Sequence, residues 1–88
     1  MPVSKAIESE TIAFNNTNPL EADFEAKCKA VVLRSTAAVY VAFDQVANTT
    51  SFLLPSDTVV EIHEPCEFTR VSALGSAGSG TLYILARR

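Results

Sequence analysis

The longest apolar run of this chain, residues 30–43 (AVVLRSTAAVYVAF), limits its possible folds most strongly. The run is rich in β-branched and aromatic residues, which favour strands, and Arg34, Ser35 and Thr36 interrupt it. We therefore predict two core strands joined by a tight turn. Side chains alternate between faces along a strand. In the second strand one face is then expected to hold Ala37, Val39, Val41 and Phe43, and the other Ala38, Tyr40, Ala42 and Asp44.

Several other segments combine apolar residues with flanking turn formers, which is typical of short strands. We expect such strands at residues 7–14, 27–33, 51–54, 58–63, 67–74 and 81–86. Turn signals at intervals of about 8–12 residues favour an all-β fold. The prediction is a small antiparallel β-sandwich, Ig-like or jelly-roll-like, or a small barrel, of about six to eight short strands. The intervening segments are too short for the helices that connect parallel strands.

The length of 88 residues supports a single domain. We expect an N-terminal arm and edge strand over residues 1–14, an acidic loop or short helix over 15–26, and a β-sandwich core over 27–88. Asn18 and Pro19 suit the start of a helix. Such a helix would span at most two turns, so an irregular connection is an equal alternative.

The edge strand is expected to have two distinct faces. One would hold Ile7, Ser9, Thr11 and Ala13, and the other Glu8, Glu10, Ile12 and Phe14. Its acidic residues discourage pairing with other sheets, as is common at edges.

The net charge of −3 disfavours general nucleic-acid binding, which requires a surplus of lysine and arginine. Residues 1–25 hold five acidic residues against Lys5 alone. This acidic part would suit a basic partner surface, although a solvated acidic face is the more common explanation. Residues 1–5 lack the apolar segment of a secretory signal, and no run approaches the length of a membrane span. We therefore expect synthesis in the cytosol.

The sequence offers little for chemistry. The GSAGSG segment at residues 75–80 lacks the lysine and helix of a phosphate loop, so a hairpin loop is expected there. His63, with Cys66 and neighbouring glutamates, provides too few ligands for a structural zinc site, and we expect His63 to be exposed at a strand end. Cys28 and Cys66 are predicted to be small core residues, and whether they pair is left open. We predict no enzyme, and no catalytic, cofactor or metal residues.

A succession of strand and turn segments runs through residues 38–86: VYVAFD, SFLLP, EI, FTRVSA and GSGTLYILA. This succession resembles small β-sandwich virion proteins of tailed bacteriophages. The resemblance implies a non-enzymatic structural protein that binds a larger assembly and is made in the cytoplasm of a host bacterium. It favours a capsid decoration or cement protein that binds and stabilises the lattice of the major capsid protein, often as a trimer. The alternative within the group is a head–tail connector or tail subunit.

We expect residues 1–26 to contact a neighbouring subunit, with the sandwich still folded after deletion of residues 2–12. Phe24 is expected to be partly exposed for a partner, and Tyr40 and Tyr83 to present hydroxyls at the surface. The predicted interaction residues are Ile7, Ile12, Phe14, Phe24, Tyr40, Arg87 and Arg88. Two other classes remain open. A sugar- or protein-binding sandwich would need an exposed aromatic platform, and an enzyme would need a cleft that gathers His63 with acids.

Overall fold

The computed structural model describes residues 7–87, apart from the side chains of residues 7, 8, 25, 26 and 64–67, and contains six strands and no helix in that range. The strands are β1 (Ile7–Phe14), β2 (Leu20–Ser35), β3 (Val39–Phe43), β4 (Phe52–Leu54), β5 (Val59–Gly75) and β6 (Gly80–Arg87). They form one antiparallel sheet with the order β1-β6-β2-β5-β3-β4. The predicted all-β, antiparallel, sandwich-like class is confirmed.

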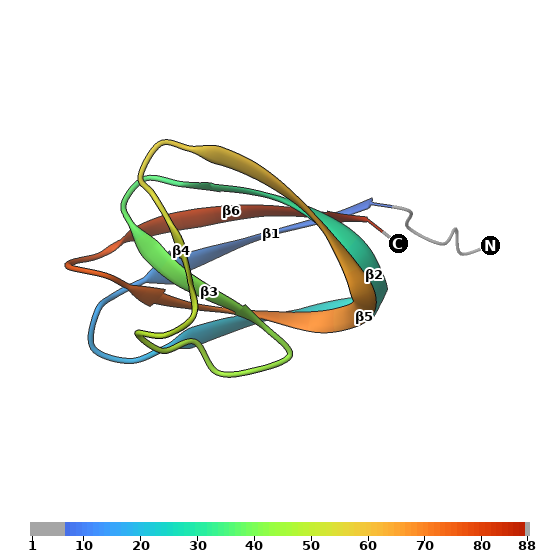
Figure 1. The fold of residues 1–88 in the computed structure, drawn as a ribbon, viewed down its shortest axis with the longest axis horizontal. Coiled ribbons are helices and arrows are strands. Elements are labelled where there is room, and N and C mark those ends of the chain that lie inside the picture. The colour runs from blue at the N-terminus through green and yellow to red at the C-terminus, as the bar shows by residue number, and fades with distance from the viewer. Residues whose placement is uncertain (1–6, 88) are drawn as a thin grey trace.

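The two long strands, β2 and β5, pair along most of their length and bend together around one end of the molecule (Figure 1). The pairing runs from Leu20↔Ala73 to Arg34↔Val59, and its register shifts on both sides of the pair Cys28↔Phe68. Such irregularities bend a strand pair. The bend divides the sheet into two layers that share β2 and β5.

The first layer contains β1, β6, the second half of β2 and the first half of β5. The second layer contains the first half of β2, the second half of β5, β3 and β4. Buried apolar side chains from both layers form one core cluster. Phe68 lies at the bend and contacts Phe24 edge-on at 6.1 Å and Phe43 at 4.9 Å between ring centroids.

The predicted alternation of faces is confirmed in β1 and β3. Val39 and Val41 are buried, whereas Tyr40 and Ala42 are only half-buried. In β1, Ile12 and Phe14 are buried and Ser9, Thr11 and Ala13 are exposed. This strand has the predicted bounds and lies at a sheet edge, paired with β6 alone.

The expected helix or irregular connection over residues 20–26 is wrong, because this segment begins β2. Ala22 and Phe24 are buried, and Glu21 and Asp23 alternate with them on the exposed face. Pairing with β5 and burial of the apolar side chains outweigh the weak helix signals at Asn18 and Pro19. The expected exposure of Phe24 is also wrong: its ring is 8% exposed and packs on Phe68.

Two expected connections also differ in the structure. The strands in residues 30–43 are not neighbours, because β5 lies between β2 and β3. Residues 76–79 do not form a hairpin loop between paired strands. They connect the end of β5, in the second layer, to the start of β6, in the first. The two strands expected at 58–63 and 67–74 are one continuous strand, β5.

Close packing explains two of the three glycines. A Cβ on Gly75 would lie 2.1 Å from the carbonyl oxygen of Gly78. A Cβ on Gly80 would lie 2.8 Å from Phe14 Cζ and 2.8 Å from Thr36 Oγ1, where the connections between the layers meet. Around Gly78 there is open space within 4 Å.

We predict that Gly75→Ala destabilises the protein by about 1–3 kcal/mol, because a backbone carbonyl has to move. Gly78→Ala, three residues away, is the matched control, and neither glycine has a positive φ that would strain an alanine. Its effect should stay within about 0.5 kcal/mol, or be slightly stabilising because alanine restricts the unfolded chain. Urea unfolding of both variants measures the difference, and equal stability of the two would contradict the packing explanation.

Candidate functional site

The outer face of the first layer presents an apolar strip made of Val32, Val59, Tyr83 and Leu85. Cross-strand pairing brings Leu85 of β6 next to Val32 of β2, and Tyr83 of β6 next to Arg34. Val59 of β5 lies on the other side of Arg34. Val59, Tyr83 and Leu85 are 64%, 44% and 41% exposed, so apolar surface of three strands faces outward.

A shallow hollow of about 220 Å³ lies over this strip, between β1, β6 and β2, and is mostly apolar. The Arg34 guanidinium lies over the Tyr83 ring at 5.8 Å from its centroid, within the range of a cation–π contact. Glu10 also lines the hollow, but strand alternation places its side chain on the face of Ile12, opposite Tyr83 and Leu85. The hollow therefore combines an apolar floor with one positive group, Arg34.

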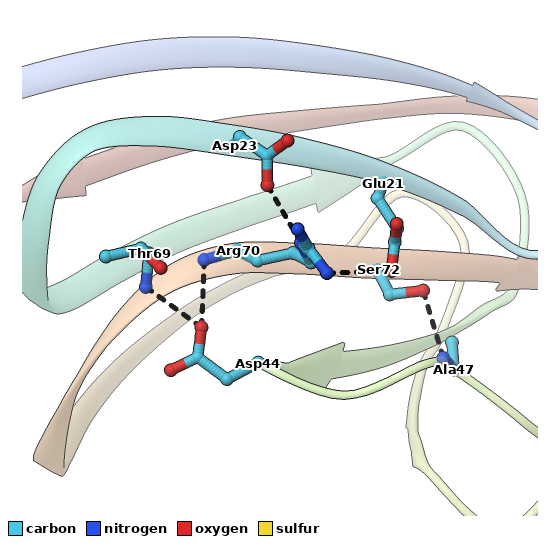
Figure 2. Close-up of polar contacts among 7 residues, drawn as sticks. All are labelled: Glu21, Asp23, Asp44, Ala47, Thr69, Arg70 and Ser72. Carbon is cyan, nitrogen blue, oxygen red and sulfur yellow. Dashed lines mark hydrogen bonds and ion pairs between the residues drawn. The ribbon is translucent and has the colours of Figure 1, made fainter.

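The outer face of the second layer carries a group of polar contacts (Figure 2), together with Leu53, which is 43% exposed. Arg70 of β5 donates a hydrogen bond from Nε to Asp23 Oδ1 at 2.8 Å and lies 3.8 Å from Glu21. The hydrogen bond with Asp23, together with the charges of Asp23 and Glu21, raises the pKa of Arg70 above its ordinary value. All three side chains are exposed, so these ion pairs contribute little to stability.

Asp44 joins the end of β3 to β5 in the same region (Figure 2). Its Oδ1 accepts hydrogen bonds from the backbone N–H groups of Thr69 at 3.0 Å and Arg70 at 3.1 Å. Its own N–H donates to the carbonyl oxygen of Arg70, and its φ is 56°. Aspartate tolerates this left-handed conformation better than most residues.

The segment after Asp44 folds back over this face. The N–H of Ala47 donates to Ser72 Oγ at 2.9 Å, and both residues are buried. Ser72 would otherwise face solvent from β5, so this hydrogen bond holds the loop of residues 44–51 against the second layer (Figure 2).

Among the side chains that the structure describes, which leave out those of Glu64, Cys66 and Glu67 beside His63, no group of three or more His, Cys, Asp or Glu is placed to hold a metal ion. His63 is exposed, as predicted, but it lies within β5 instead of at a strand end, and its Nε2 lies 2.7 Å from Glu61. Cys28 is buried, as predicted for a small core residue, whereas the side chain of Cys66 lies outside the described residues.

The predicted interaction residues do not form one surface. Ile12, Phe14 and Phe24 belong to the core and offer no exposed surface, since strand alternation turns them inward. Tyr40 is half-buried on the second layer and Arg87 is exposed, while Arg88 and the side chain of Ile7 lie outside the described part of the chain.

Sequence reasoning missed the apolar strip, except for the expected exposure of Tyr83. A signal was present in β6, where apolar residues occupy both faces: Leu82, Ile84 and Ala86 are buried while Tyr83 and Leu85 face outward. A strand in contact with solvent on one face usually alternates apolar and polar residues.

Comparison with known proteins gives no match to a family model, a curated protein or a solved structure. The part of the chain that the structure describes contains no helix long and apolar enough to cross a membrane.

We predict that Asp44→Ala destabilises the protein by about 1–3 kcal/mol, because it removes a charged acceptor of two backbone hydrogen bonds. Asp44→Asn keeps an acceptor oxygen and tolerates the positive φ, so it should lose less than about 1 kcal/mol. Asp44→Gly should lie between them, since it relieves the backbone but lacks the acceptor. Denaturant unfolding measures this order, and an alanine variant as stable as the asparagine variant would contradict the role of the carboxylate.

Proposed function

We propose that this protein is a non-enzymatic structural subunit that binds a larger protein assembly through the apolar strip. Within this class we favour a capsid decoration protein of a tailed bacteriophage, in line with the resemblance of residues 38–86 to small virion proteins. The apolar strip is the observation that supports the proposal, because contiguous exposed apolar surface commonly marks a protein contact.

The composition of the strip suits a flat protein partner better than a small molecule. Tyr83 and Leu85 lie on a regular strand in the middle of a sheet, so their positions are fixed before binding. Preorganised aromatic and aliphatic side chains are effective interface anchors because little rotamer entropy is lost. Arg34 at the hollow provides a positive charge that favours one orientation of the partner.

A decoration protein does not need tight single contacts. Neighbouring binding positions on a lattice raise the effective concentration of each copy when the copies are themselves linked, as in an oligomer. The exposed edge of β1 gives a further means of contact, since an extended segment of another chain can add to a sheet edge.

That the sandwich stays folded without residues 2–12 remains a prediction, and this deletion would not separate a lost contact from a lost strand. That deletion removes most of β1, including the buried Ile12. A deletion limited to residues 2–6 leaves β1 complete and is the appropriate way to test an N-terminal contact.

We predict that Leu85→Lys reduces co-sedimentation with phage-like capsids lacking this protein by at least about ten-fold, because a charge replaces apolar contact area. Leu53→Lys is the matched control: Leu53 is 43% exposed, against 41% for Leu85, but it lies on β4 of the second layer. It should bind as the unmodified chain does.

Equal loss in both variants, or in neither, would contradict binding through the strip. Stoichiometric binding that also makes the shell more resistant to heat supports the decoration role. If the protein does not bind capsids but binds isolated tails or head–tail connectors, the alternative position in the virion would be favoured.

A further inference from the structure

A second hollow, of about 330 Å³, lies where β3 extends beyond its partner β4. Its lining is mainly polar and includes Phe43, Gln45, Asn48, Ser51 and Phe52. None of them is charged. We propose that this hollow is a saccharide-binding site, with one sugar ring packed against Phe52.

The backbone of Phe43 provides the first argument. The pairing of β3 with β4 ends at Val41↔Phe52, so the strand edge beside Phe43 faces the hollow instead of a strand. The hydrogen bond from the Asp44 N–H to the Arg70 carbonyl marks Phe43↔Val71 as a non-hydrogen-bonded pair of the ladder. The N–H and C=O of Phe43 therefore point away from β5, toward the hollow. One donor and one acceptor at this spacing match a sugar hydroxyl, which both donates and accepts.

The loop holds one further polar group in a fixed position, Asn48, and a second, Gln45, that is free to turn toward a ligand. Asn48 accepts hydrogen bonds at Oδ1 from the N–H and the hydroxyl of Thr50, and its own N–H donates to Ser51 Oγ at 3.0 Å. The side-chain NH₂ of Asn48 is left to donate to a ligand. Gln45 is exposed and forms no hydrogen bond with any described residue. Fixed donors reduce the entropy lost on binding.

Phe52 supplies the apolar part of the site. Its ring is 47% exposed at the sheet edge and lines the hollow among polar groups. An exposed aromatic ring beside amides and hydroxyls suits the C–H face and hydroxyl rim of a sugar ring. The absence of lysine and arginine from this lining argues against phosphates or nucleotides.

An added peptide strand fits the hollow less well. The free strand edge is one residue long, at Phe43, because the positive φ of Asp44 turns the chain away directly after it. Strand addition depends on several consecutive backbone hydrogen bonds. The hollow also lies away from the apolar strip, on the other layer, so the two sites do not compete.

The test begins with the full chain on a glycan array, followed by titration of the best saccharide into ¹⁵N-labelled protein. We expect saturable chemical-shift changes centred on the amides of residues 43–52. Phe52→Ala and Gln45→Ala should each weaken binding at least about ten-fold, and Phe52→Tyr should retain it because stacking is preserved. Leu53→Ala, one residue away on the opposite face, is the control and should bind as the unmodified chain does.

Gln45→Ala keeps the test valid if Phe52→Ala fails to fold, since Gln45 is exposed and unbonded within the described residues. No saturable binding to any saccharide on the array overturns the proposal. Shift changes centred away from the residues that line the hollow, or wild-type affinity in both Gln45→Ala and folded Phe52→Ala, overturn it as well.

Discussion

The bend of the β2–β5 ribbon is the constraint on which the rest of the structure depends. The register shifts around the Cys28↔Phe68 pair allow each strand to belong to both layers, so one sheet can bury its own inner face. Phe68, with Phe24 and Phe43, fills the space where the layers converge. A chain of this size has a thin core. Any change that straightened this ribbon would expose the inner faces of both layers together.

Local pattern was sufficient to predict the class of fold and most strands, including both ends of β1 and the alternation of Val39 and Val41 with Tyr40 and Ala42. These features depend on side-chain period, which is a property of neighbouring residues. The strand over residues 20–26 was predictable on the same basis, because Ala22 and Phe24 alternate with Glu21 and Asp23. The capping signals at Asn18 and Pro19 favour a helix instead, but that helix would be too short to be stable.

Pairing was not predictable in the same way. β2 and β3 are consecutive along the chain, but β5 lies between them in the sheet. Likewise β5 and β6 are consecutive, but β2 lies between them. Which strands pair depends on burial of the whole core, to which Leu54, Leu82 and Phe14 contribute from distant parts of the chain. The two hollows share this dependence: the first requires β6 beside β2, and the second exists because β4 begins only at Phe52. Neither could be located before the pairing was known.

The outer faces of the two layers carry different clusters of side chains, which bears on how the protein would be oriented on a partner. The first carries the apolar strip with Tyr83 and Leu85. The second carries the ion pair of Arg70 with Asp23 and the loop of residues 44–51, which is held by the hydrogen bond of the Ala47 N–H. Burial of the apolar strip favours attachment through the first layer. Attachment through the strip would therefore leave the loop of residues 44–51 and its hollow facing solvent. One small sandwich would then have an anchoring face and an accessible binding face, without any movement between them.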